Sequence, residues 1–245
     1  MRINVSLFRY PEVGEEVFKI KERMIPAVVV KRMNRFLVQV KIEGRDADVH
    51  LHDPGRLKEL IYPGADVLIR KTHGDRTNYS ITAALKNNET ILVDTRFHNQ
   101  IGEMFIEEPT GREVKYEDSR FDFSVMDGFV EIKGCTMQIH DYVIFPDAPS
   151  IRGTKHLMEL SHLKRSGRNA GVIFLLFRGK ADYFYPNKIT DQKFAAAFFE
   201  ALSSGVEICF PRFIMEETSI IYNGTASLGR DPTDIFARMK EELKD

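Results

Sequence analysis

The stretch that decides the fold runs from Ser119 to Gly134 and reads SRFDFSVMDGFVEIKG. Apolar and polar residues alternate on both sides of Asp127-Gly128, as in two β-strands joined by a tight turn. An Asp-Gly pair favours a two-residue turn, because a type I′ turn needs positive φ at both central positions. We therefore predict a β-hairpin with the pairs Met126–Phe129, Ser124–Glu131 and Asp122–Lys133.

The two faces of this predicted hairpin differ in character. One carries Asp122, Ser124, Glu131 and Lys133, and the other carries Phe121, Phe123, Val125, Val130 and Ile132. Asp122 would face Lys133 and lie diagonal to Glu131, at a Cβ separation of ~7–8 Å. Two carboxylates so placed can hold Mg²⁺, which proteins bind through one or two carboxylates plus waters. Lys133 would then orient or deprotonate a water on the metal. A solvated outer face with a cross-strand Asp–Lys pair is the alternative interpretation.

Composition limits the class of protein. The chain has 245 residues, 43% of them hydrophobic, which predicts one large or two modest domains with a sizeable core. We find no apolar run of ~20 residues and no signal-peptide pattern in residues 1–10, so we expect a cytoplasmic protein without a membrane span. Cys135 and Cys209 lack zinc-site spacing. With a net charge of −1, binding to nucleic acid would need a local basic surface.

Residues 1–86 are predicted to form a small barrel domain with an N-terminal extension. Residues 1–23 receive no assigned structure. Alternating runs then follow at 27–30, 36–42, 46–51, 65–70 and 79–85, with turn signals between them and a short helix expected at 56–60. Five short strands and one helix fit an oligonucleotide/oligosaccharide-binding (OB) barrel.

The barrel offers groups that could contact nucleic acid. Its cations are Lys31, Arg32, Arg35, Arg70, Lys71 and Arg76, and Phe36 and Tyr79 are candidate stacking partners for bases. A purely structural barrel, with its aromatic residues in its own core, fits the strand pattern equally well.

Residues 87–245 predict a second, α/β domain with a mixed sheet. Apolar periodicity predicts helices at 94–108, 151–165, 191–202 and 231–244, with Thr190 as the cap of the third. Strands are predicted at 112–117, in the hairpin, and at 171–178, 181–185, 206–215 and 219–222. The helix at 151–165 and the residues after it are basic: Arg152, Lys155, Lys164, Arg165 and Arg168 lie close together, with His156 and His162 nearby. Such a stretch suits a phosphodiester backbone, although a solvated helix face has the same pattern.

Several motifs resemble a known family. Asp122 followed by Glu131-Ile132-Lys133 resembles the PD-(D/E)xK nuclease signature, with Phe-Asp in place of the usual Pro-Asp. Longer stretches are similar to the sugar fermentation stimulation protein (SfsA) family over residues 24–230. These are residues 35–38, 52–57 and 62–67 in the first part, and 113–116, 119–123, 130–134, 145–148 and 152–160 in the second.

The resemblance implies an OB-like domain joined to a restriction-endonuclease-like domain, and DNA binding without sequence specificity. It also implies a role in regulating sugar (maltose) metabolism. Asp122, Glu131 and Lys133 carry over as metal and catalytic positions, and Glu103 as the acidic residue on the helix before the sheet. His52-Asp53-Pro54-Gly55 departs from the family's usual Pro-Asn-Thr-Gly loop.

Our leading hypothesis is a nuclease that uses Mg²⁺ or Mn²⁺. Asp122, Glu131 and the carbonyl of Ile132 would hold the metal, with Glu103 as a further ligand, and Lys133 would serve the attacking water. Arg152, Lys155 and His156 would bind neighbouring phosphates, as would Lys31, Arg32 and Arg35 of the barrel. A homodimer would suit an enzyme that cuts both strands. The alternatives are a DNA-binding regulator without turnover and a sugar- or metabolite-binding protein.

Overall fold

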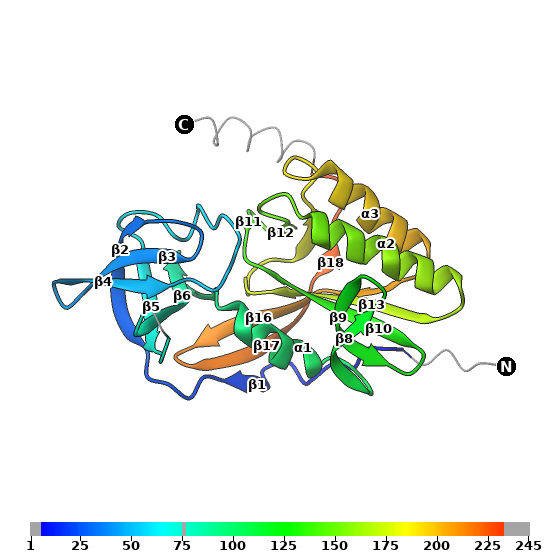
Figure 1. Cartoon of the computed structure of the whole chain (residues 1–245), viewed down its shortest axis with the longest axis horizontal. Helices are drawn as coiled ribbons and strands as arrows, with labels where there is room; N and C mark the ends of the chain where they lie inside the picture. The colour runs from blue at the N-terminus through cyan, green and yellow to red at the C-terminus, as the bar shows by residue number, and fades with distance from the viewer. Residues whose placement is uncertain (1–5, 75–76, 233–245) are drawn as a thin grey trace.

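The computed structural model describes residues 6–74 and 77–232, which form a β-barrel and a larger α/β part (Figure 1). The barrel sheet has the order β4-β3-β2-β5-β6-β7, and a parallel bridge between His50 and Ser80 closes β4 on β6. Its strands are β2 (Ile25–Arg32), β3 (Leu37–Ile42), β4 (Arg45–His50), β5 (Asp66–Lys71), β6 (Tyr79–Lys86) and β7 (Glu89–Leu92). The predicted OB-like barrel is thus confirmed, and β7 adds a strand to it.

The interior of the barrel follows from the alternation in its strands. Every second residue of β3 and β4 points inward, and Val38, Val40 and Val49 are completely buried. The segment 56–60 forms turns and not the predicted short helix.

The large sheet of the α/β part has the order β1-β17-β16-β13-β10-β9-β8. Its strands are β1 (Glu16–Lys19), β8 (Gly111–Tyr116), β9 (Ser119–Val125), β10 (Gly128–Cys135), β13 (Asn169–Leu176), β16 (Pro211–Glu216) and β17 (Ser219–Thr225), and β15 (Glu207–Cys209) pairs with β13. The central strands β10 and β13 run parallel. Strand β13 is apolar almost throughout because both of its faces are covered.

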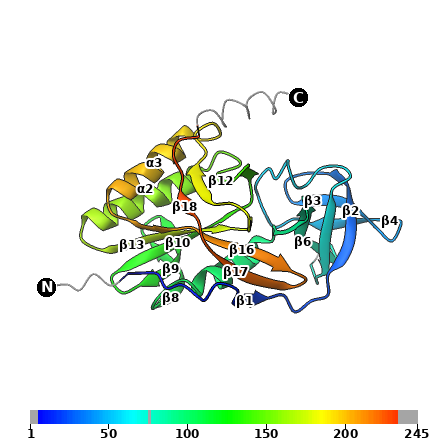
Figure 2. The ribbon, with the colours of Figure 1, turned by 180° about the vertical axis from the view of Figure 1, so that it is seen from behind.

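Two helices cover one face of this sheet, α2 (Ile151–Arg165) and α3 (Gln192–Ser203) (Figures 1 and 2). Ser150 caps α2 by accepting a hydrogen bond from the backbone N–H of Gly153 at 3.2 Å. The bounds of α2 match the prediction, but the cap of α3 is Asp191 and not Thr190: Asp191 accepts from the N–H of Phe194 at 2.9 Å. A small sheet lies beside these helices, with strands β11 (Gln138–Ile139), β12 (Tyr142–Phe145), β14 (Tyr183–Pro186) and β18 (Ser227–Leu228).

The opposite face of the large sheet shares a continuous apolar core with the barrel. This core includes Val67 and Ile81 of the barrel as well as Ile132 and Ile173 of the sheet. Between them lie a 3-10 turn, η1 (Thr95–Phe97), and a short helix, α1 (His98–Glu103). The helix predicted at 94–108 is therefore shorter than expected, since the chain turns after Glu103 to bring Phe105 and Ile106 into the core.

The N-terminal segment, which we grouped with the barrel, lies against the large sheet, where β1 pairs with β17. The helix predicted at 231–244 falls almost entirely outside the described residues. Among the residues that the structure describes, no helix is long and apolar enough to cross a membrane.

Candidate active site

The β9–β10 hairpin has a different register from the predicted one. The observed pairs are Val125–Gly128, Ser124–Phe129 and Phe123–Val130, so Met126 and Asp127 form the turn. The pairing is shifted by two residues, and an even shift keeps the same side chains on the same face. The pairing ends at Phe123–Val130, and beyond it the Asp122 carboxylate accepts from the backbone N–H of Ile132, which places it near Glu131 without the predicted strand pair to Lys133.

The physical reason for the shift lies in a neighbouring strand. A Cβ atom on Gly128 would collide with the backbone carbonyl of Asn169 at the start of β13. Gly128 is therefore required by the close approach of β13 and not by the turn. The residue with positive φ is Asp127, at 57°.

The predicted division into a polar and an apolar face holds for every apolar residue except Phe121, and both faces of β10 are covered. Phe123, Val125, Val130 and Ile132 join the core shared with the barrel. Phe121 instead joins the core beneath α2 and α3, where its ring stacks on that of Phe129 at 5.1 Å. Glu131 is buried beneath α2 with only 2% of its surface exposed. The solvated-face alternative thus does not describe this hairpin.

The two carboxylates are held by different sets of donors. Asp122 Oδ2 accepts from the backbone N–H of Ile132 at 2.7 Å, in place of a strand-to-strand hydrogen bond, and Oδ1 accepts from Asn99 Nδ2 at 3.1 Å. Glu131 Oε1 is paired with the Lys133 ammonium and lies 2.6 Å from Nδ1 of His156. The other oxygen, Oε2, is buried and accepts no hydrogen bond from any residue that the structure describes.

His156 is placed behind Glu131 and not on the surface where we expected it to bind phosphate. It is 2% exposed, and its Nε2 accepts from Arg152 Nε at 3.4 Å. An accepting Nε2 places the ring proton on Nδ1, toward Glu131. The 2.6 Å approach of Nδ1 to Oε1 packs His156 against the Glu131 carboxylate.

The electrostatics of the two acids differ. Burial, and then the nearby charge of Glu131, raise the pKa of Asp122 to about 6. Burial also opposes ionisation of Glu131, but Lys133 and His156 outweigh it and hold the pKa of Glu131 below its usual value. Two neighbouring carboxylates with pKa values pushed apart are typical of functional sites.

These groups open into a cavity of about 700 Å³ between the barrel and the large sheet. Asp122, Glu131, Ile132 and Lys133 line it from the sheet, Arg96 and Asn99 from η1 and α1, and Asp53 and Pro54 from a barrel loop. The loop in which the sequence departs from the family pattern therefore forms part of the wall. Burial raises the pKa of Asp53 to about 6.

The acidic residue that accompanies this pair is Glu113 and not Glu103. Both carboxylate oxygens of Glu103 bind Arg112, with Arg112 Nη2 at 2.5 Å, and Glu103 is absent from the cavity lining. Glu113 lines the cavity and accepts from Asn99 Nδ2 at 2.9 Å, so Asn99 bridges Glu113 and Asp122. Glu113 belongs to the family-like stretch 113–116, but neither it nor Asn99 was predicted as a site residue.

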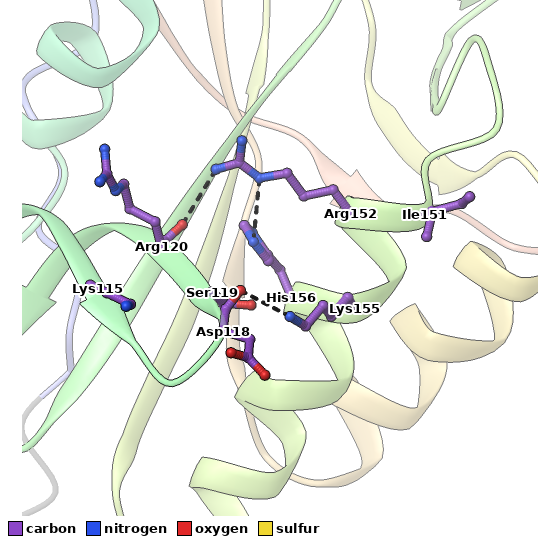
Figure 3. A pocket seen from close by; sticks show the side chains of 8 residues that line it. All are labelled: Lys115, Asp118, Ser119, Arg120, Ile151, Arg152, Lys155 and His156. Atoms are coloured by element: carbon purple, nitrogen blue, oxygen red, sulfur yellow. Dashed lines mark hydrogen bonds between the residues drawn. The ribbon is translucent and has the colours of Figure 1, made fainter.

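The N-terminal part of α2 forms the wall of a second, basic cavity of about 810 Å³ (Figure 3). Its lining includes four cationic side chains and one carboxylate, namely Lys115, Arg120, Arg152, Lys155 and Asp118. Arg152 donates to the carbonyl of Arg120 and Lys155 to that of Asp118, which ties α2 to β9 and to the turn before it. We refer to this space as the basic cavity and to the previous one as the carboxylate cavity.

The predicted barrel cations are placed differently from one another. Lys31 and Arg35 are exposed, whereas the guanidinium of Arg32 braces a loop by donating to the carbonyls of Gly55 at 2.8 Å and Arg35 at 2.9 Å. Arg70 is buried against Asp94 at 2.6 Å. Phe36 is 43% exposed, while Tyr79 packs against the core.

Comparison with known proteins shows which family the chain belongs to. The family model described as "Sugar fermentation stimulation protein RE domain" matches residues 88–219, and "SfsA N-terminal OB domain" matches residues 30–93. The chain belongs to the sugar fermentation stimulation protein family. The structure and the sequence thus agree on an OB barrel followed by a mixed-sheet α/β part.

Relatives within the family cover nearly the whole chain. A sugar fermentation stimulation protein homolog from Saccharolobus solfataricus is 44% identical over 219 residues, covering 89% of this chain and 91% of the relative. The homolog from Thermoplasma volcanium is 45% identical over 201 residues, covering 82% and 93%. The solved structure of Pyrococcus furiosus SfsA in complex with Ca²⁺ has a TM-score of 0.81 at 27% identity, covering 89% of this chain and all of that one.

Proposed function

We propose that this protein is a Mg²⁺- or Mn²⁺-dependent nuclease that hydrolyses phosphodiester bonds in DNA. The observation that supports this proposal most directly is the adjacency of Asp122 and Glu131, with Lys133 beside them, in a cavity of about 700 Å³. Buried acids are stabilised only when they are paired or when they bind a cation.

The donor set fits a hard divalent cation. Glu131 Oε2 has no donor among the described residues, and each carboxylate oxygen of Asp122 can accept a second contact. The backbone carbonyl of Ile132 is the third candidate ligand. Within residues 6–74 and 77–232 no three His, Cys, Asp or Glu side chains cluster as a metal site. A cation held here would thus keep several water ligands, as Mg²⁺ does. Ca²⁺, named with the Pyrococcus furiosus protein, is also a hard cation that prefers oxygen ligands.

When bound, the cation would supply the positive charge that offsets charge building up on the scissile phosphate. Lys133 would hold the attacking water and stabilise the same developing charge. His156 packs against the Glu131 carboxylate and accepts from Arg152, and Asn99 donates to Asp122. These contacts hold the acidic pair in one geometry before substrate arrives.

The basic cavity supplies sites for the DNA backbone beside this centre. Arg152 lines both cavities, and Lys155 is 46% exposed next to it. Cations so placed neutralise phosphates irrespective of base sequence, which supports binding without sequence specificity.

The test is cleavage of plasmid, single-stranded and branched DNA in Mg²⁺, Mn²⁺ or EDTA. We expect metal-dependent products that Asp122→Asn and Lys133→Met reduce by about 10²-fold or more, with DNA binding retained. Asp127→Asn is the matched control, because it removes the same charge from the far end of the same hairpin. A salt-sensitive gel shift without any product would favour the non-catalytic DNA-binding regulator instead.

A further inference from the structure

Two further cavities adjoin the carboxylate cavity, and an arginine lines each of the two junctions. Arg152 lines both the basic cavity and the carboxylate cavity. Arg96 lines both the carboxylate cavity and a third cavity of about 500 Å³ on the barrel. The third one, which we call the histidine cavity, is lined by His50, His52, Thr72, His73 and Ser80 among others. The proposed catalytic centre is therefore flanked by the basic cavity on one side and by the histidine cavity on the other.

Arg96 is fixed in its position at the barrel junction. Its Nε and Nη2 bind the two carboxylate oxygens of Asp94 at 3.0 and 2.9 Å. Asp94 is fully buried and is also bound by Arg70. Arg70 also lies 3.9 Å from Glu22, so two acids balance the two arginines, and the Arg96 side chain remains 41% exposed. A cation held by a buried anchor is suited to one defined phosphate.

Beside Arg96, the histidine cavity presents flat imidazole rings. The rings of His50 and His52 lie 4.2 Å apart, and Phe36 stacks on His50 at 6.1 Å with planes 6° apart. Burial lowers the pKa of His52 to about 4 and also lowers that of His50, so both rings are neutral at pH 7. Neutral and aromatic rings bind the faces of unpaired bases, which a duplex keeps stacked inside.

The geometry points to one track for an unpaired nucleic-acid strand, running from the histidine cavity past the carboxylate pair to the basic cavity. This inference rests on the proposed nuclease function and specifies its substrate. Arg96 and Arg152 would bind phosphates on either side of the scissile bond, and Phe36 and His50 would stack on bases. Because the track continues on both sides of the centre, we infer that the protein cuts a strand internally and needs no free end.

The deciding substrate is a covalently closed single-stranded DNA circle, which has no end. With Mg²⁺ or Mn²⁺, we expect the circle to be opened at a rate similar to that of a linear strand of the same sequence, and much faster than a relaxed double-stranded circle. An intact single-stranded circle beside a degraded linear strand would overturn the inference and leave the nuclease function standing. Equal rates on the two kinds of circle would overturn the preference for unpaired strands. No cleavage of any substrate with either metal would overturn both proposals.

Variants test the barrel end of the track separately. Phe36→Ala should weaken binding of single-stranded DNA about tenfold, the size expected for one stacked base, and leave duplex binding unchanged. Arg96→Gln should lower the slope of log K against log salt by about 0.7, the share of one phosphate on a single strand.

The controls use residues of the same barrel that line none of the three cavities and that, unlike Phe36, do not stack on a ring that lines one. Tyr62→Ala removes an aromatic ring that is 45% exposed. Arg45→Gln removes a cation at the other end of β4, about 17 Å from His50 by strand rise. Melting curves establish that each variant is folded. A loss of single-strand binding equal in the variants and their controls would refute the assigned track.

Discussion

Gly134→Ala should destabilise the protein through a single steric contact next to the proposed centre. Gly134 follows Lys133 on β10, and an added Cβ would collide with Cε1 and Nδ1 of His98 and lie 2.9 Å from its Nε2. The ring cannot move away easily, because it is buried against Phe177 at a centroid distance of 4.9 Å. Overpacking of this kind costs about 1–3 kcal/mol. At about 2–4 °C per kcal/mol for a chain of this size, the Tm should fall by roughly 2–12 °C.

A double-mutant cycle separates this contact from other effects of the substitution. The steric cost exists only when the methyl group and the ring are both present, so Gly134→Ala combined with His98→Ala should be less destabilised than the sum of the single variants. The expected difference is about 1–3 kcal/mol, measured by urea denaturation. Gly134→Ala should also cleave DNA more slowly, since α1 carries Asn99 to Asp122. Additive single effects, or an unchanged Tm for Gly134→Ala, would refute the reasoning.

Three further predictions concern the acids, the pH and the metal. Glu113→Ala should reduce metal-dependent cleavage several-fold, because it removes the oxygen that accepts from Asn99, whereas Glu103→Ala should leave the rate within about twofold. The reverse ranking would restore Glu103 as the ligand. Burial lowers the pKa of His98 to about 4, so between pH 6.5 and 4 the unfolded chain binds a proton that the folded protein does not. The free energy of unfolding should therefore fall by up to about 3 kcal/mol on acidification relative to His98→Asn, as measured by urea titrations at pH 7 and pH 4. Mg²⁺ at ten times its Kd should raise the Tm by about 3–6 °C in the wild type and not in Asp122→Asn, and an equal rise in both would place the cation elsewhere.

Much of the fold follows from local patterns. Alternation predicted the five barrel strands from Ile25 to Lys86, and apolar periodicity predicted the bounds of α2. Both signals act between residues that are close in sequence. The family resemblance was likewise carried by contiguous motifs, and the two family models confirm it.

The errors come from contacts between residues far apart in the chain. The hairpin register depends on Asn169, which lies against Gly128 although it comes 41 positions later in the sequence. The burial of Glu131 depends on His156, whose role no spacing rule indicated. Glu103 was favoured because it lies on a helix, but the short α1 turns it toward Arg112. The metal, DNA binding and catalysis remain proposals that the experiments above address.

The apolar core that barrel and sheet hold in common has a mechanical consequence. A hinge between the two halves would have to expose Val67, Ile81, Ile132 and Ile173 together, and the 3.2 Å ion pair of Arg178 with Glu89 would break as well. The distance between the histidine cavity and the acidic pair is therefore fixed. A strand in the proposed track would have to span this fixed distance. The cut would then fall a set number of nucleotides from the base bound at the barrel.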